Sequence, residues 1–277
     1  MAITSVYSAV SLDRQRLANV RLTSSGTQQI AVGIAALIGW EHVYLSCPVS
    51  AIEDLGTHVE ITTAAGDVVA ARKCIISIPS TMYRDLDISP SLPCRTQAIV
   101  DNTKLGDYNK VIVCYDSPWW REKGFNGFFM SYTGPIALAR DTSIDELSHY
   151  SLTCFVNGEM GRRWSRLHPH ERRAAVLHQI ARVYKVEADS EAYRPIEMFD
   201  QIWMHEKYSK GALVPVTALG HLTGYADVYG KPVGNLHFVG TEYSTEWKGY
   251  MEGALCSGEV GAEEVVSALR GREMARL

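Results

Sequence analysis

Three consecutive residues near the end of the sequence, Gly240, Thr241 and Glu242, follow an apolar run and precede a helix rich in small residues. The run 235–240 is typical of a strand, and we expect the helix to begin at about Gly249. Glycine leaves the backbone open to a ligand, and a helix N-terminus presents unpaired N–H groups. This order suits an anionic ligand, with Glu242 accepting hydrogen bonds from ribose or ribityl hydroxyls. The alternative is a helix packed tightly on a sheet, with Glu242 exposed.

Lys110 lies inside the apolar run "YNKVIVCY", residues 108–115. A lysine in such a strand needs a functional or paired reason to point inward, and is merely solvated if it points outward. Trp203 and Tyr250 are further candidates, either as site aromatics or as core aromatics. His205 and Glu206 could act as an acid–base pair, although a solvated loop is the favoured interpretation. Residue types alone leave these alternatives open.

The histidines and cysteines do not predict a metal site. His168 and His170 flank Pro169, and this "HPH" pattern indicates the start of a helix rather than two metal ligands. The six cysteines are scattered without a C-x-x-C pair, and most lie in apolar runs. We interpret them as reduced core thiols of an intracellular, cytoplasmic protein.

Composition excludes several classes of function. The 277 residues are 46% apolar and carry a net charge of −4, without any run of Lys or Arg longer than a pair. This argues against a nucleic-acid surface and against a polybasic membrane patch. No apolar stretch reaches the roughly 18–20 residues of a membrane span, and the N-terminus shows no signal-peptide pattern. A small-molecule substrate is the expected ligand.

Periodicity predicts a mixed α/β protein. A helix with one apolar face is expected at residues 28–38, ending at Gly39, and strands with a turn at Gly66 follow it. Further strands are expected at "YNKVIVCY", "GFFMSYT" and "YSLTCFVN", and a helix at "HERRAAVLHQIARVYK". The "SPWW" stretch, residues 117–120, is interpreted as core packing. Two interleaved regions are expected rather than two consecutive domains.

The closing segment "FVGTEYSTEWKGYMEGALCSGEVGAEEV" resembles the C-terminal signature of the flavin-containing amine oxidases, the family of monoamine and polyamine oxidases. The resemblance extends over most of the chain. "CPVSAIEDLGTHVEITTAAGDVVAARKCIISIP", "LGDYNKVIVCYDSPWW" and "WMHEKYSKGA" are similar to further family motifs and occur in the family's order. It implies a mixed α/β, truncated flavin amine oxidase fold, in which a partial FAD-domain sheet is interleaved with a substrate domain of mixed sheet and helices.

The resemblance also implies roles for residues that would hold FAD. The backbone of Val49 would hold the adenine, and Gly240, Thr241 and Glu242 would form the turn at the flavin end, together with the Met251 backbone. The family's cofactor chemistry is the oxidation of an amine C–N bond by FAD.

The catalytic residues implied by the resemblance are Lys110, Trp203, Leu213 and Tyr250. Lys110 matches the lysine that reaches flavin N5 through a water, and Trp203 matches a tryptophan beside the flavin. Tyr250 is the remaining aromatic of a cage whose other wall is Leu213 here. Ala212 stands where some relatives bond the flavin through cysteine, so any FAD is expected to be non-covalent.

The departures from the family concern the pyrophosphate. No G-x-G-x-x-G turn follows a strand in the first hundred residues, and the chain begins about where the family is two-fifths complete. Segments 1–24 and 100–205 would then belong to the substrate domain, and 25–99 and 206–277 to the FAD domain. FAD is accordingly expected to bind weakly or not at all to this chain alone.

Two classes of function follow. The first is amine oxidation with FAD, possible only as part of a larger or split enzyme. The second is a flavin-independent isomerase, cyclase or dehydratase, or a non-catalytic binding protein, that reuses the scaffold. Because an incomplete dinucleotide fold exposes sheet edges and apolar helix faces, we expect a homo-oligomer or a complementary N-terminal half chain to cover them.

Overall fold

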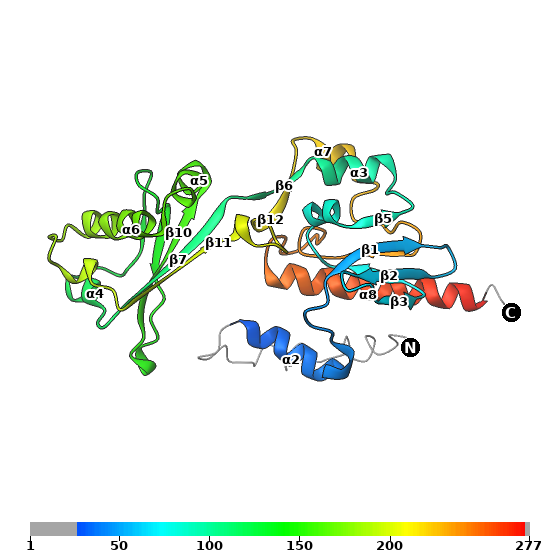
Figure 1. The fold of residues 1–277 in the computed structure, drawn as a ribbon, viewed down its shortest axis with the longest axis horizontal. Coiled ribbons are helices and arrows are strands. Elements are labelled where there is room, and N and C mark those ends of the chain that lie inside the picture. The colour runs from blue at the N-terminus through cyan, green and yellow to red at the C-terminus, as the bar shows by residue number, and fades with distance from the viewer. Residues whose placement is uncertain (1–26, 275–277) are drawn as a thin grey trace. The chain divides into compact units, whose positions relative to one another are not determined.

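The computed structural model describes residues 27–274 and divides the chain into two compact units. Unit 1 comprises Met1–Thr103 and Thr217–Leu277, and unit 2 comprises Lys104–Val216 (Figure 1). Strands and helices alternate in both units, so the predicted mixed α/β class is confirmed. The segment 1–24 that was assigned to a substrate domain lies outside the described residues. The assignment of the other segments to FAD and substrate domains stays a prediction.

Unit 2 is built on a five-stranded antiparallel sheet in the order β11-β7-β10-β9-β8. Its strands are β7 (Tyr108–Tyr115), β8 (Phe129–Met130), β9 (Leu138–Asp141), β10 (Tyr150–Asn157) and β11 (Glu197–Ile202). Side chains of β7 alternate strictly between half-buried and buried, as a strand with one covered face requires. The strand predicted at "GFFMSYT" is reduced to the two residues of β8.

Helices cover the buried face of this sheet. They are α4 (Trp119–Glu122), α5 (Gly158–Ser165) and α6 (Pro169–Tyr184), with the short 3-10 turns η4 (Asp145–Leu147) and η5 (Glu191–Tyr193). Val176, Leu177 and Ile180 of α6 enter one large apolar cluster with β7 and β10. Trp119 and Trp120 are also buried in this cluster, which confirms the core interpretation of "SPWW".

The start of α6 confirms the interpretation of the "HPH" pattern. His168 is the N-cap and Pro169 the first helical residue, where its missing N–H costs nothing. The Glu171 carboxylate accepts a hydrogen bond from the His168 backbone N–H at 2.9 Å. No group of three or more potential metal ligands is found within residues 27–274.

A two-stranded sheet joins β6 (Thr103–Gly106) to β12 (Ala212–Thr217), and the 3-10 turn η6 (Trp203–His205) follows β11. The two strands approach closely at Gly106. A Cβ at this position would lie 2.8 Å from the carbonyl oxygen of Ala212. Glycine at 106 therefore allows β12 to lie against β6.

Unit 1 holds a four-stranded sheet in the order β3-β2-β1-β5 and a separate two-stranded sheet, β13-β4. The strands are β1 (Val49–Asp54), β2 (Val59–Thr63), β3 (Val68–Ala71), β4 (Cys74–Ile76), β5 (Asp87–Ser89) and β13 (Leu236–Phe238). β4 and β13 run parallel. In β4, Ile75 is exposed between the buried Cys74 and Ile76.

The helices of unit 1 are α2 (Gln28–Ile38), α3 (Cys94–Asp101), α7 (His221–Gly224) and α8 (Met251–Met274), with the 3-10 turns η2 (Trp40–His42) and η3 (Ser80–Asp85). The predicted helix 28–38 and its end at Gly39 are confirmed. Its apolar face is only partly covered, because Leu37 is exposed while Ile30, Ile34 and Ile38 are half-buried.

The small residues of α8 allow close packing, as predicted. A Cβ at Gly261 would collide with the side chain of Val239, and one at Gly253 would collide with the carbonyl of Trp247. Although α8 is long, no helix of the described residues is apolar enough to cross a membrane.

Candidate functional site

Lys110 points to the face of the unit 2 sheet that lies opposite the buried cluster. Its neighbours Asn109 and Val111 are buried, whereas Lys110 is half-buried. Phe155 on β10 and Gln201 on β11 are its register partners. Nζ lies 5.5 Å from the centroid of the Phe155 ring, within the range of a cation–π contact. The Lys110 ammonium is therefore held against an aromatic ring.

The ring of Phe155 also contacts a second aromatic ring. The ring of Tyr108, two residues before Lys110 on β7, meets Phe155 edge-on with centroids 6.1 Å apart. Sequence reasoning missed Phe155, because "YSLTCFVN" carries no motif. Its place opposite Lys110 depends on strand register, which a single strand does not encode.

An apolar row continues from Phe155 over this open face of the sheet. Leu138 is the register partner of Phe155, and Met130 is the partner of Leu138. On the other side of β7, Phe199 pairs with Ile112. Met130 and Phe199 are 64% and 59% exposed, so the row presents large apolar side chains to whatever covers it.

Two other predicted site residues lie near the same end of β7. Trp203 follows Ile202, which pairs with Asn109. Leu213 is the second residue of β12, next to the Ala212 carbonyl that approaches Gly106. Both side chains are exposed. Ile202 pairs with Asn109, the neighbour of Lys110, and Gly106 precedes Lys110 by four residues. The predicted role of this group in catalysis stays a prediction.

His205 and Glu206 have the features of a solvated loop. Both are exposed, and the Glu206 carboxylate accepts a hydrogen bond from the Gln201 amide at 2.6 Å. The favoured interpretation of these two residues agrees with this placement.

In unit 1 the turn at Gly240 is fastened to the start of α8. Thr241 Oγ1 donates to the Tyr250 carbonyl at 2.8 Å and accepts from the Gly249 N–H at 2.7 Å. The Gly240 N–H donates to Ser257 Oγ at 3.0 Å. Gly240 has a φ of 145°, and the nearest atom to an added Cβ would be the Ser77 carbonyl oxygen at 3.9 Å. The backbone at Gly240 is therefore accessible to a ligand.

Glu242 is buried rather than exposed, so the exposed alternative is wrong. One carboxylate oxygen accepts from the Ser80 N–H and the other from Ser80 Oγ, both at 2.7 Å. Burial raises the pKa of Glu242, and the Ser80 hydrogen bonds and the charge of Lys248 oppose this shift. In this conformation the carboxylate fastens η3 to the turn. No sequence signal pointed to Ser80, since the two residues are 162 positions apart.

Val49 and Tyr250, the remaining predicted residues, are both surface residues of unit 1. Val49 begins β1 beside an irregularity in its pairing with β2, and its side chain is partly exposed. Tyr250 is 66% exposed, immediately before α8, and its ring meets Trp247 edge-on at 6.0 Å. Met251 is the first residue of α8.

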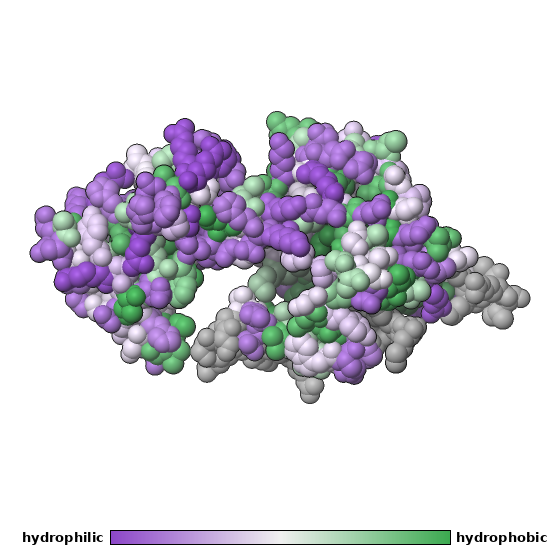
Figure 2. Space-filling view, viewed as in Figure 1, coloured by the Kyte–Doolittle hydropathy of each residue, from purple (hydrophilic) through white to green (hydrophobic). Residues whose placement is uncertain are grey.

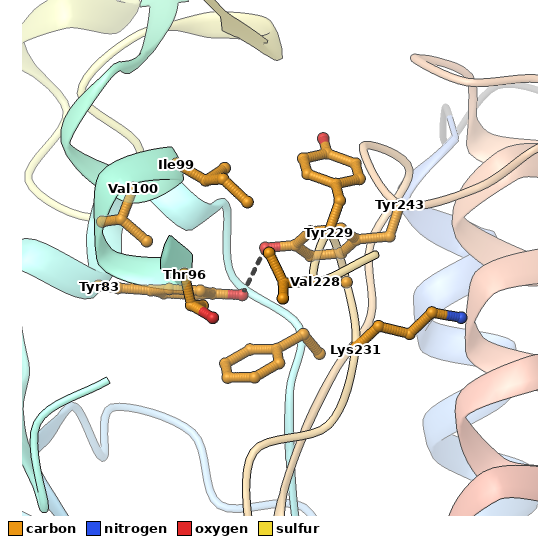
Figure 3. A pocket seen from close by; sticks show the side chains of 10 residues that line it. Tyr83, Thr96, Ile99, Val100, Val228, Tyr229, Lys231 and Tyr243 are labelled. Atoms are coloured by element: carbon orange, nitrogen blue, oxygen red, sulfur yellow. Dashed lines mark hydrogen bonds between the residues drawn. The ribbon is translucent and has the colours of Figure 1, made fainter. Parts of the chain in front are cut away.

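A small cavity in unit 1 lies behind the Glu242 turn. Figure 3 shows the hydroxyls of Tyr83 and Tyr243 facing each other across it, 3.2 Å apart. The cavity measures about 10 Å³, the size of one water. Burial raises the pKa of both tyrosines. The cavity is too small for an amine or a cofactor, and we interpret it as a packing gap in the core.

FAD consists of an adenine end, a pyrophosphate and a flavin end, and the residues present fit the two ends. The partly exposed start of β1 at Val49 suits the adenine, and the open backbone at Gly240 beside the α8 N-terminus suits the flavin end. The pyrophosphate needs a glycine-rich turn before a second helix. No two glycines of the sequence are separated by a single residue, so the chain contains no such fingerprint.

Comparisons with known proteins identify relatives of this chain. The family model described as "Flavin containing amine oxidoreductase" matches residues 2–266. The probable flavin-containing monoamine oxidase A of Dictyostelium discoideum is 32% identical over 88% of this chain and 53% of its own length. Amine oxidase B of Sus scrofa is 33% identical over 88% of this chain and 46% of its own. The chain thus spans about half the length of these relatives.

Solved structures give the same picture. Putrescine oxidase bound to putrescine superimposes with a TM-score of 0.81 at 26% identity, over 87% of this chain and 53% of that one. Cyclohexylamine oxidase from Brevibacterium oxydans gives a TM-score of 0.81 at 27% identity, over 88% and 53%. In both comparisons this chain spans about half of the solved structure.

Proposed function

The chain belongs to the flavin-containing amine oxidoreductase family, and from this premise we propose that it provides the substrate-facing sheet and the flavin-end turn of an FAD-dependent amine oxidase. FAD supplies the oxidant, taking up the two electrons and two hydrogens released as R₂CH–NH₂ becomes R₂C=NH. The observation that carries the proposal is Lys110, held by Phe155 beside a row of large apolar side chains on an uncovered sheet face. Val49, Gly240, Thr241 and Met251 would contact FAD, which Ala212 leaves non-covalent.

Lys110 and the apolar row act on the substrate through electrostatics. Apolar surroundings disfavour an ammonium, and the positive charge of Lys110 disfavours a second cation near it. Both effects favour the neutral amine, whose lone pair is needed for oxidation. Lys110 itself can donate hydrogen bonds from Nζ to a water in the site, the role implied by the family resemblance.

The same face favours an apolar monoamine over a diamine. Among the described strand positions on this face, Glu197 is the one carboxylate, and it lies four residues from Gln201, the partner of Lys110. Four strand residues span about 13 Å. The carboxylate of Glu206 is nearer, but it is exposed and accepts a hydrogen bond from the Gln201 amide. A second ammonium desolvated near Lys110 would therefore lack a buried counter-charge, which is costly.

The pyrophosphate of FAD must be held by residues that this chain does not contain. Burying its charge without donors costs several kcal/mol per ion, whereas one helix end contributes only about 0.3–2 kcal/mol. A complementary polypeptide with the glycine-rich turn is therefore part of the proposal, and so is the use of Trp203, Leu213 and Tyr250 as aromatic and apolar walls for the amine.

Reconstitution tests this function. The 277-residue chain is mixed with FAD and with the part of Sus scrofa amine oxidase B outside its matched residues, here called the complement. We expect bound flavin, absorbing at roughly 450 nm, that bleaches without oxygen on addition of cyclohexylamine and much less with putrescine. Lys110→Met should slow bleaching, while Lys104→Met, an exposed lysine of β6, should not. Bound flavin that no amine bleaches would contradict the proposal.

The missing glycine fingerprint favours one other function, a flavin-independent enzyme or binding protein that uses the open sheet face. Under this alternative the mixture stays colourless with the complement present. Binding of cyclohexylamine to the colourless chain, measured by calorimetry and abolished by Phe155→Asp, would then support it.

A further inference from the structure

Helix α2 is the most apolar helix surface left uncovered in unit 1. The nine residues 30–38 contain no polar or charged side chain. Nevertheless Ala35 is the one buried residue of α2, and Leu37 is 53% exposed. In Figure 2 the visible surface at α2 is mainly white and green, the colours of neutral and hydrophobic residues. An isolated helix shorter than about 12–15 residues is marginal in water, so α2 needs a packing partner.

The uncovered surface continues beyond the helix. Trp40 in η2 is half exposed, and Tyr44 and Leu45 are 77% and 73% exposed. The principal contact of α2 among the described elements is with η2 itself. Residues 28–45, here called the α2 segment, therefore present aromatic and aliphatic side chains in succession, the composition found in the buried centre of protein interfaces.

Charge and length exclude a membrane as the occupant. A helix of eleven residues is about 16 Å long, roughly half of the hydrocarbon thickness. A helix that lies on a membrane surface carries Lys or Arg on its polar face. The α2 segment has neither, and its charged residue is Glu41. The occupant is therefore a protein.

Area argues against a second copy of this chain. Two α2 helices in contact would bury a few hundred Å² in total, while stable interfaces bury about 1,200–2,000 Å². A partner that surrounds the segment is required. The solved relatives supply such a partner in principle, because about half of each chain has no counterpart here, although the matched half superimposes closely.

A second feature of unit 1 supports a further packing partner. Its parallel sheet β13-β4 consists of two strands of three residues each. Parallel sheets normally have more strands and are covered on both faces.

We infer that the α2 segment is the docking site for the amine-oxidase part that this chain does not span. The inference rests on the proposed function for the identity of the partner. It is independent of the chemistry, because docking requires neither FAD nor an amine. Leu37 is the central contact, since it lies in the middle of the segment and its side chain is 53% exposed.

The experiment measures association without FAD. The complete chain and the complement of Sus scrofa amine oxidase B are mixed, and binding is followed by analytical ultracentrifugation. We expect Leu37→Asp to weaken binding at least 100-fold, because an unpaired carboxylate would be buried, and Leu37→Ala to weaken it about 5–10-fold. Val68→Asp is the matched control, since Val68 on β3 is similarly exposed at 57%. It should bind as the parent chain does.

Hydrogen exchange supplies the second measurement. The α2 amides should exchange rapidly in the chain alone and at least 100-fold more slowly with the complement. Equal binding by the parent chain and Leu37→Asp overturns the inference, and so does failure of the complement to bind. A chain that dimerises through Leu37, without binding the complement, overturns it in favour of a second copy. If the complex forms but does not oxidise an amine, the proposed function is contradicted and the docking site is still supported.

Discussion

Unit 2 and unit 1 differ in how completely their apolar surfaces are covered. The buried cluster of unit 2 has nineteen residues, and that of unit 1 has nine, although unit 2 is the shorter segment. Helix α6 of unit 2 places its apolar stripe in the cluster, whereas α2 of unit 1 leaves most of its surface in water. We propose that this difference reflects packing partners that unit 1 gains from further polypeptide.

The comparison assigns different tasks to the two units. Unit 2 is a closed scaffold whose one open sheet face carries Lys110 and Phe155, a candidate substrate surface. Under the proposed function, unit 1 would provide two separate contacts for FAD, at Val49 and Gly240, and the complement would provide the rest. Because these two contacts leave the pyrophosphate without donors, this chain alone is expected to bind FAD weakly.

The largest expected effect is the loss of a core residue from unit 2. Trp120 is fully buried, packs against Tyr115 and Trp119, and donates from Nε1 to Asp141 at 2.8 Å. Trp120→Ala should lower the free energy of unfolding of unit 2 by about 3–5 kcal/mol. Leu37→Ala in unit 1 should change stability by no more than about 0.5 kcal/mol in the chain alone. Urea unfolding followed through unit-specific amides measures both, and similar losses would contradict the comparison.

A smaller effect is expected at Gln179 of α6. Its buried amide accepts from the Ile136 N–H at 2.7 Å and donates to the carbonyls of Thr133 and Ile136. Gln179→Ala should destabilise unit 2 by about 1–3 kcal/mol, because buried backbone groups lose their partner. Arg173→Ala, an exposed change on the same helix, is the control. Unchanged amide exchange at residues 133–136 in Gln179→Ala would show that the loop is held otherwise.

The unfolding free energies of the two units should respond differently to pH between 6.5 and 4.5. Burial lowers the pKa of His237, with Lys73 acting in the same direction and Glu264 opposing it. The stability contributed by neutral His237 is thus present above about 6.5 and is lost as pH falls towards its folded pKa. Glu242 has the opposite sign, since its raised pKa makes stability fall as pH rises from about 4.5.

For Asp141 of unit 2, the corresponding response lies at lower pH. The pKa of Asp141 is about 2, lowered by hydrogen bonds from Arg121, Ser143 and Trp120 that outweigh its burial. Its contribution is present above about 3.8 and is lost only as pH falls towards 2. Hydrogen exchange at pH 6.5 and 5.5 should show loss of stability in unit 1 alone. His237→Gln should remove that loss, and a loss that persists in this variant would assign it to another group.

A small effect on folding is expected at Lys110. A cation–π contact at a partly exposed site contributes about 0.5–1 kcal/mol. Lys110→Met should therefore change the unfolding free energy of unit 2 by no more than about 1 kcal/mol, and Lys104→Met by less. Thermal unfolding of the two variants measures this. A loss of several kcal/mol in Lys110→Met alone would make Lys110 a structural residue.

How far the sequence predicted this molecule depended on the range of each interaction. The strand β7, the start of α6 at His168 and the end of α2 at Gly39 follow from local patterns, and all three are confirmed. The Glu242–Ser80 contact and the Phe155–Lys110 pair join distant segments, so no local pattern encodes them. The exposure of Leu37 was also unpredictable, because an apolar stripe indicates which face seeks cover but not whether the cover is present.

Residue-resolved hydrogen exchange of the complete chain, with and without the complement, tests the central claim most directly. The account predicts that β7 and β10 amides are strongly protected in the chain alone, and that α2 and β13 amides are weakly protected. It further predicts that adding the complement raises protection in unit 1 while unit 2 changes little. Equal and high protection of both units in the chain alone, unaffected by the complement, would contradict it.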